Sequence, residues 1–261
     1  MDERERQFQA LLAYARQDAD VLGLYVFGSR AREDDLSDDR SDYDVAVVLE
    51  DRDGALETFD ARWPHVHGAP VEVTRSTLAE LRDVRGEYGA PDEWSRYGYT
   101  RVDVILDKTG EIEPILRAKR TVPADVRDQL VRDALDGYIN STYRSLRYRM
   151  VGAQEGARLD GAESIPHLLT ALFAIDGRVR PFNKYLAEEL RERPLNEPAW
   201  HADRLLPRLL SLLEGDVEEQ QALFRDVDRV ARARGFAQVV ESWEPDVAWL
   251  RGEADYRPGR R

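Results

Sequence analysis

The chain has 261 residues, of which 42% are hydrophobic, and a formal net charge of -13. This length suits one large domain or two modest ones. The absence of cysteine excludes a disulfide framework and a cysteine-ligated metal site. The negative charge argues against broad binding to a nucleic-acid backbone, which needs basic surface, and is compatible with a cationic small-molecule partner.

The N-terminal segment predicts a helix and a cytoplasmic location. Apolar residues recur at helical spacing over residues 4–18. The preceding residues are charged and lack the apolar region of a secretion signal. No apolar run in the chain approaches the roughly 18 residues of a membrane span. We therefore expect a cytoplasmic protein with no membrane partner.

A Gly-Ser turn follows the first predicted strand. The apolar run 22–27 predicts a buried strand, Gly28 and Ser29 end it, and a short helix over 29–35 follows. Gly28 allows backbone N–H groups to approach a phosphate closely, and Ser29 adds a hydroxyl. Arg30 and Arg32 come next; they are candidate phosphate contacts, or they pair with the acidic residues that follow.

Two aspartates begin the next predicted strand, 42–50. Asp42 and Asp44 stand at i and i+2, so their side chains share one face of the strand, with Cα atoms roughly 6–7 Å apart. Such a pair suits Mg²⁺, which binds few carboxylates together with water and nucleotide phosphates. The alternative is a solvated acidic loop, because residues 33–44 contain seven acids. A phosphate turn beside paired carboxylates indicates phosphoryl or nucleotidyl transfer.

A third acid stands in a later strand. Glu72 is ionisable within an otherwise apolar strand, and it meets Asp42 and Asp44 if the two strands are neighbours. The alternatives are an outward-facing Glu72 and Asp103, which is also flanked by valines. The elements predicted between residues 54 and 106 are a helix at 54–63, a strand at 69–74, a helix with capping-box spacing from Thr77 to about 84, an irregular loop at 85–99 and a strand at 102–106.

No strand is predicted after Pro123. The predicted helices are 124–155, 164–176, 181–192, 201–213, 217–233 and 236–250, with glycines and prolines as breaks, among them Gly156, Gly161 and Pro166. The fold class is therefore α+β: a small mixed-sheet domain, residues 1–120, precedes an all-α helical bundle, residues 121–261.

Two further groups of residues are candidates for substrate contacts. Pro181 suits the first turn of a helix, and Lys184 and Tyr185 follow near its start, where anions bind favourably. The alternative for this basic segment is an ordinary solvated helix end. Trp94, Tyr97 and Tyr99 are candidates for the wall of a substrate pocket.

The pattern Gly28-Ser29 … Asp42-Tyr43-Asp44 resembles the signature of the polymerase-β-like nucleotidyltransferase superfamily. The segment 70–74, Pro-Val-Glu-Val-Thr, and the succession of an α/β domain and a helical bundle resemble the aminoglycoside nucleotidyltransferases that modify streptomycin and spectinomycin. The resemblance implies that Asp42 and Asp44 hold Mg²⁺, as two ions, against the triphosphate of ATP. It also implies that Glu72 is the third carboxylate, which acts as a base and joins Asp42 and Asp44 as a metal ligand.

The function expected from these features is Mg²⁺-dependent transfer of AMP from ATP to a hydroxyl of a small molecule, with a cationic, aminoglycoside-type antibiotic as the favoured acceptor. The nucleotide contacts expected are Gly28, Ser29, Arg30, Lys184 and Tyr185, and the cleft is expected between the two domains. The alternatives are transfer to a lincosamide, or to a protein or RNA as in toxin–antitoxin nucleotidyltransferases, and a non-catalytic nucleotide-sensing module.

Overall fold

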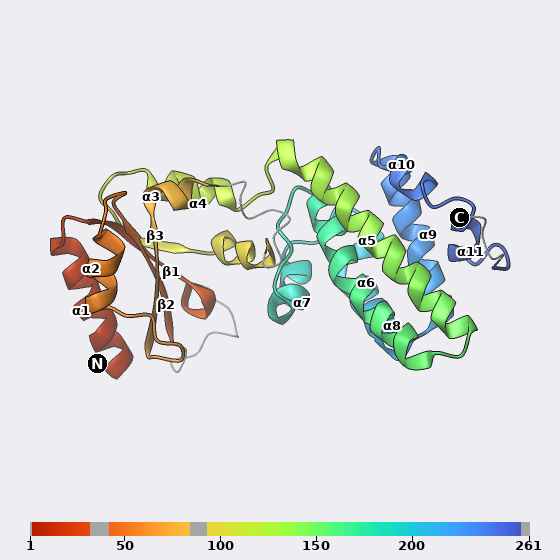
Figure 1. Ribbon diagram of the computed structural model, residues 1–261, viewed down its shortest axis with the longest axis horizontal. Helices are drawn as coiled ribbons and strands as arrows, with labels where there is room; N and C mark the ends of the chain where they lie inside the picture. Colours follow the sequence, from red (N-terminus) through yellow and green to blue (C-terminus); the bar gives the residue numbers. More distant parts are fainter. Residues whose placement is uncertain (1, 32–41, 84–92, 257–261) are drawn as a thin grey trace. The chain divides into compact units, whose positions relative to one another are not determined.

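The chain is described by a computed structural model that covers residues 2–31, 42–83 and 93–256 (Figure 1). It divides into two compact units, Met1–Thr121 and Val122–Arg261. The first contains the β-sheet and the second is built from helices. Arg32, and most of the helix predicted over 29–35, lie outside the described residues.

A four-stranded sheet forms the centre of the first unit, with strand order β3-β2-β1-β4. Strands β1 (Val21–Phe27) and β2 (Tyr43–Leu49) are antiparallel, β4 (Asp103–Asp107) is antiparallel to β1, and β3 (Val71–Thr77) is parallel to β2. The sheet is therefore mixed, as the sequence predicts, and β3 is one of its edges.

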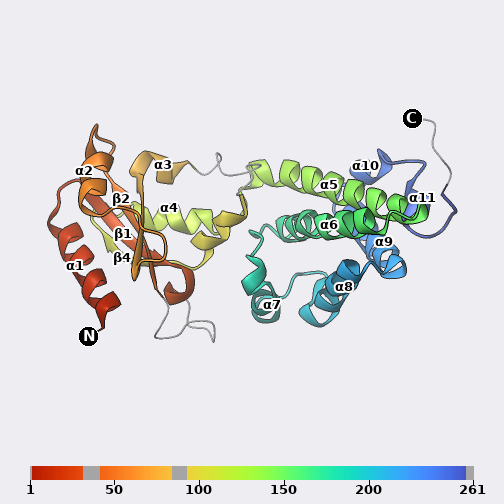
Figure 2. The same ribbon diagram turned by 60° about the horizontal axis from the view of Figure 1, so that its bottom comes forward.

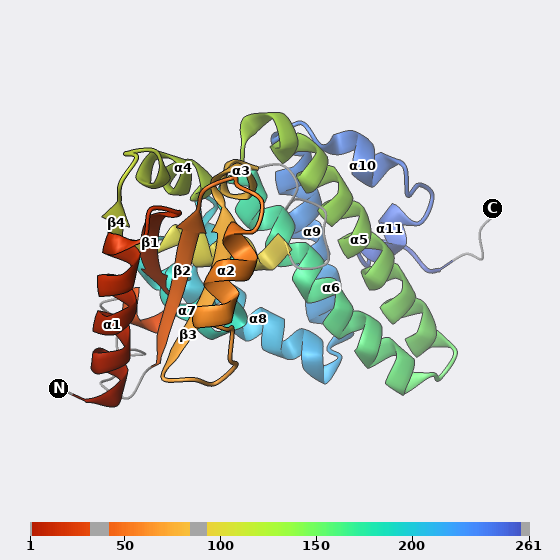
Figure 3. The ribbon, with the colours of Figure 1, turned by 60° about the vertical axis from the view of Figure 1, so that its left-hand side comes forward.

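Different helices cover the two faces of the sheet. Helices α1 (Glu3–Gln17) and α2 (Ala55–Arg62) pack on the face that carries Val26 and Val45 (Figure 3). Helices α3 (Leu78–Arg82) and α4 (Ile112–Lys119) pack on the face that carries Tyr25 and Ala46. Because neighbouring residues of a strand point to opposite faces, β1, β2 and β4 contribute to both cores, whereas the apolar residues of β3 pack only beneath α1 and α2.

Short helices in this unit test the local predictions. The capping box is confirmed: Glu80 N–H donates to Thr77 Oγ1 (3.2 Å), and Thr77 N–H donates to Glu80 Oε2 (2.8 Å). A 3-10 turn, η1 (Gly28–Ala31), follows β1. The irregular loop predicted at 85–99 is wrong where it is described, because Glu93–Thr100 forms the 3-10 helix η2. Helix α4 was not predicted.

In the second unit, α5 and α6 lie side by side (Figures 1 and 2). Buried leucines and aromatic rings from α5, α6, α8 and α9 form one core, which includes Tyr138, Phe173 and Phe224. The helices are α5 (Ala124–Met150), α6 (Gln154–Ile175), α7 (Asn183–Glu192), η3 (Pro198–Trp200), α8 (Ala202–Glu214), α9 (Val217–Ala233), α10 (Ala237–Glu241) and α11 (Val247–Leu250).

Three helix boundaries predicted in this half are wrong. Helix α6 begins at Gln154 and runs through Gly156, Gly161 and Pro166. Gly161 does not break the helix and packs closely against α5, because a Cβ there would lie 3.3 Å from Ser145 Oγ. The single helix predicted at 236–250 is two helices, with Pro245 in the segment between them. Pro181 precedes α7, whose N-cap is Phe182, and is not in its first turn.

The α+β fold class predicted from the sequence is confirmed, with a small mixed sheet followed by a mostly helical region. Across the described segments, no helix combines the length and apolar character needed to cross a bilayer.

Candidate active site

The turn after β1 lies against a carboxylate of β2. Phe27, the last residue of β1, pairs with Asp44, and Gly28 follows with a φ of 71°. A Cβ at Gly28 would lie only 2.1 Å from Asp44 Oδ2. Glycine is required here for two reasons: the positive φ, which other residues adopt at a cost, and the close approach of the carboxylate. The backbone of the turn therefore packs directly against the carboxylate of Asp44.

The Gly28 contact gives a first testable expectation. Gly28→Ala should lower both the melting temperature and the transfer rate, because the added methyl group displaces Asp44 in addition to straining the backbone. Gly54→Ala is a matched control, since Gly54 has a φ of 80° with nothing within 4 Å of its Cβ position. In both variants, alanine at a positive φ costs about 1–2 kcal/mol of backbone strain. Equal rates in the two variants would show that the turn does not position Asp44.

Two of the three predicted carboxylates occupy neighbouring register positions. The parallel pairing of β2 with β3 sets Asp44 opposite Glu72. Side chains at paired positions of adjacent strands point to the same face of a sheet. Asp42 lies one residue before β2 and is exposed; Arg4 Nε donates to its Oδ1 at 3.0 Å. Asp44 and Glu72 thus lie side by side, and Asp42 is bound to helix α1.

Two histidines and a backbone N–H surround the carboxylate of Glu72. Gly68 N–H donates to Oε2 at 3.2 Å, His67 Nδ1 lies 3.3 Å from Oε2, and His65 Nε2 lies 3.7 Å from Oε1. Partial burial acts to raise the pKa of Glu72, but the Gly68 hydrogen bond and the two histidines outweigh it and leave the pKa below its ordinary value. Glu72 is therefore held in the ionised form that a general base requires.

Asp103, the alternative third acid, lies elsewhere. It pairs with Val26, and Val26 packs in the core beneath α1 and α2. Asp103 is therefore at a register position on the opposite face from Asp44, and strand β1 separates it from β2. The register favours Glu72 over Asp103 as the third carboxylate.

Arg30 lies on the α1 side of the sheet. Its Cζ is 4.0 Å from the centroid of the Tyr43 ring, which stacks on Phe8 of α1 with ring centroids 4.5 Å apart. Tyr43 also donates a hydrogen bond to Glu5 Oε2 at 2.5 Å. The structure thus gives Arg30 a cation–π contact with Tyr43, away from the face that carries Asp44 and Glu72.

The oxygen ligands near the turn are of the chemical type that a hard cation prefers. Carboxylate oxygens from Asp42 and Asp44, beside an open backbone turn, are the ligands that Mg²⁺ prefers. Among the residues that the structure describes, however, no three His, Asp or Glu side chains are grouped closely enough to hold a metal ion.

A small cavity opens on the same face of the sheet as the carboxylates. Its volume is about 170 Å³, and it is lined by Tyr25, Phe27, Thr74, Gly98 and Tyr99. Tyr25 and Thr74 both pair with Ala46, two residues along β2 from Asp44. Tyr99 therefore lines a cavity, as the sequence suggests; Tyr97 is buried, and the side chain of Trp94 is outside the described part.

The predicted nucleotide contacts of the second unit lie at the start of α7. Lys184 is exposed, with Nζ 5.1 Å from the ring centroid of the buried Tyr185. The neighbouring Arg178 has a structural role, because Nη2 donates to Glu189 Oε1 and Nη1 to the carbonyl oxygen of Arg193, both at 2.7 Å. Lys184 is thus the more accessible of these two cations.

Comparison with known proteins bears on the first unit. Residues 9–135 match the family model described as "Nucleotidyltransferase domain". This part of the chain is similar to nucleotidyltransferase domains. The match contains β1, η1, β2 and β3, and so the turn and all three predicted carboxylates. The enzyme class predicted from the sequence, a nucleotidyltransferase, is confirmed.

Other comparisons add little detail. A solved structure of a nucleotidyltransferase-like protein from Exiguobacterium sibiricum is similar to this chain over 96% of its length and 92% of that chain, with 13% sequence identity and a TM-score of 0.42. No curated protein matches the sequence significantly. The acceptor of the nucleotidyltransferase domain must therefore be inferred from chemistry.

Sequence reasoning did not find the two histidines beside Glu72. These residues are His65 and His67. Their actual place follows from the turn at Gly68, which brings the loop alongside β3, so that His65 Nδ1 contacts the carbonyl oxygen of Val73 at 3.0 Å. The sequence signal that could have indicated this contact is a pair of histidines, His65 and His67, that precedes Glu72 with a Gly-containing turn between them.

Proposed function

We propose that this nucleotidyltransferase is Mg²⁺-dependent and transfers AMP from ATP to a hydroxyl group of a small cationic acceptor of the aminoglycoside type. The observation that carries the proposal is the register that sets Asp44 beside Glu72, next to a glycine turn that accommodates Asp44. Acidic groups for a cation, a base for a hydroxyl and a turn for phosphate then share one end of the sheet.

The residues divide the chemistry between them. Asp42 and Asp44 would hold Mg²⁺, which when bound supplies the positive charge that offsets the triphosphate. The backbone at Gly28 and the hydroxyl of Ser29 hold phosphate oxygens. Glu72 accepts the proton of the acceptor hydroxyl. The hydroxyl oxygen then bonds to the α-phosphorus of ATP, and the bond between the α-phosphorus and pyrophosphate breaks. The remaining rate acceleration comes from holding the acceptor hydroxyl close to the α-phosphate of ATP, which makes the reaction effectively intramolecular.

The acceptor is inferred from charge and from the aromatic cavity. The chain carries a net charge of -13, and acidic sites attract cations over distances limited by salt to about 8 Å at physiological ionic strength. Tyr25, Phe27 and Tyr99 line the cavity on the carboxylate face. Aromatic faces stack on sugar-like or planar rings and also attract ammonium groups. A cationic acceptor with rings suits both features.

An acceptor panel tests the proposal directly. With labelled ATP and Mg²⁺, we expect transfer to at least one aminoglycoside, weaker at high salt, and release of pyrophosphate only when the acceptor is present. A lincosamide, RNA and protein complete the panel. Transfer only to RNA or protein would replace the antibiotic acceptor by a macromolecular one. Nucleotide binding without transfer to any acceptor would indicate a sensing module.

A contact from the helical unit is also proposed. Lys184 is an exposed cation at the start of α7, and an ammonium is a compact charge suited to a phosphate oxygen. Lys184→Ala should weaken transition-state stabilisation by about 2–4 kcal/mol, the scale for losing one preorganised donor. The measurement is kcat/KM for ATP.

Arg191→Ala is the control for Lys184, because it removes an equal charge from the exposed last turn of the same helix. Equal rates for the two variants would show that α7 does not contact the nucleotide. The helical unit would then contribute only to acceptor binding or to stability.

A further inference from the structure

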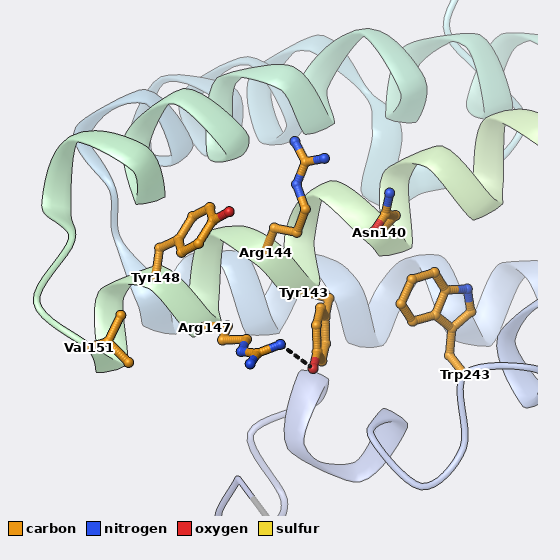
Figure 4. A pocket seen from close by; sticks show the side chains of 7 residues that line it. All are labelled: Asn140, Tyr143, Arg144, Arg147, Tyr148, Val151 and Trp243. Atoms are coloured by element: carbon orange, nitrogen blue, oxygen red, sulfur yellow. Dashed lines mark hydrogen bonds between the residues drawn. The ribbon is translucent and has the colours of Figure 1, made fainter. Parts of the chain in front are cut away.

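A second groove lies on the helical unit, independent of the carboxylate site. Its volume is about 510 Å³, within the range of small-molecule sites. It is lined by Trp243 and by residues of the C-terminal half of α5, among them Tyr143, Arg144, Arg147 and Tyr148. In Figure 4, Arg144 and Tyr148 project from one side of α5, and Tyr143 and Arg147 from the other. The lining of the groove thus includes a guanidinium group and an aromatic ring from each side of the helix.

The charge of this segment is opposite to that of the chain. Residues 137–154 contain three arginines and no acid, although the whole chain has a net charge of -13. The acids that contact lining residues are already engaged: Asp160 accepts from Arg144 Nε at 3.1 Å, and Asp136 accepts from Trp243 Nε1 at 2.8 Å. Asp160 offsets the charge of Arg144, and the neutral indole of Trp243 leaves Asp136 charged, so an anion in the groove is attracted chiefly by Arg147.

Arg147 is the accessible cation of the groove. Its side chain is exposed, and its contact with Tyr143 Oη is long, at 3.5 Å. Within the segments that the structure describes, Arg147 forms no ion pair. A guanidinium in this state can give two hydrogen bonds to a phosphate group without first breaking a salt bridge.

The aromatic rings of the groove are held in place by the protein. Tyr143 packs on Trp243 and Trp249, with ring centroids 5.8 Å and 5.6 Å apart. Tyr148 lies against Gly156 of α6, where a Cβ would be 3.3 Å from its ring. The rings are thus positioned before any ligand arrives, which lowers the entropy cost of stacking a planar group on them.

We propose that this groove binds a nucleotide unit, with a planar base stacked on the tyrosine and tryptophan rings and a phosphate bound by Arg147. Stacking on aromatic side chains together with arginine contacts is how proteins hold unpaired bases and their phosphates. The unit is either a free nucleotide or part of a single strand, since both present the same base and phosphate. This site does not depend on the carboxylates of the sheet or on the proposed acceptor.

The test uses the full chain in EDTA, which removes divalent cations and so separates this site from a metal-dependent one. AMP and an eight-nucleotide oligoadenylate are titrated by calorimetry, and adenosine without phosphate tests the charge requirement. We expect binding that weakens with salt, and about tenfold or greater weakening in Arg147→Ala and in Tyr148→Ala, the scale for losing a charged hydrogen bond or one stacked base.

Arg158→Ala is the matched control, because Arg158 is an exposed arginine of α6 that does not line the groove. Stronger binding of the oligonucleotide, with the same dependence on Arg147, would identify a nucleic-acid strand as the ligand. Comparable binding of AMP would identify a free nucleotide. The proposal is overturned if neither probe binds, or if both alanine variants bind as Arg158→Ala does. If the acceptor panel shows no AMP transfer, nucleotide binding to this groove is still expected, because it does not depend on the carboxylates of the sheet.

Discussion

Replacing Asp44 with asparagine is expected to lower the turnover rate by at least about 10²–10³-fold, the scale for losing one preorganised electrostatic partner. The amide keeps the shape of the side chain beside Gly28 but removes the charge that offsets a metal–triphosphate complex. Asp42→Asn should have a similar effect on rate. Both are measured as pyrophosphate release at saturating acceptor.

The stability of these variants separates a catalytic role from a structural one. Repulsion between neighbouring carboxylates falls when one is neutralised, so the melting temperature of Asp44→Asn should be kept or rise. Asp42→Asn loses the ion pair with Arg4, which is partly exposed and contributes about 0–1 kcal/mol. Asp53→Asn, an exposed acid beyond the other end of β2, is the control. Near wild-type rates in both Asp42 and Asp44 variants would contradict the metal-binding role.

Glu72→Gln is expected to slow the chemical step by roughly 10²–10⁴-fold while nucleotide affinity changes little. Glutamine retains an oxygen that can accept the hydrogen bond from Gly68, but it cannot take a proton from the acceptor hydroxyl. Single-turnover kinetics measures the step, and calorimetry measures ATP binding in the presence of Mg²⁺.

Three outcomes distinguish the roles open to Glu72. A large loss of nucleotide affinity would make Glu72 chiefly a metal ligand. An unchanged rate would remove it from the chemistry. Asp103→Asn is the paired variant, since Asp103 is an acid of the same sheet at a position on the opposite face. We expect its rate to be close to that of the unaltered protein.

The strands and most helices of this protein could be predicted from the sequence because they follow simple periodicities. The apolar runs that became β1 and β2 are short, bounded by polar residues and too apolar to be loops. The capping box at Thr77 is a local signal, and its two hydrogen bonds depend only on residues three apart. The α+β class follows from the order of these elements.

The features that could not be predicted depend on packing between distant segments. The sequence predicts a helix break at Gly161, yet Gly161 lies within α6, where a Cβ would be 3.3 Å from Ser145 Oγ. The pairing of β2 with β3 decides which acid lies beside Asp44, and no local pattern contains that register. The contact between Arg30 and Tyr43 likewise joins residues on either side of a long segment.

The parallel register between β2 and β3 makes the site sensitive to insertions within β3. Side chains of a strand alternate between faces, so a shift of one residue moves a whole strand's side chains to the other side. One residue inserted between Val71 and Glu72 would itself lie opposite Asp44 and would direct Glu72 towards the face covered by α1 and α2. A substitution can be compensated by its neighbours, whereas such an insertion separates the acids completely. Among relatives of this protein, we therefore expect loop 63–70 to vary in length while the spacing from the first paired residue of β3 to its acid stays constant.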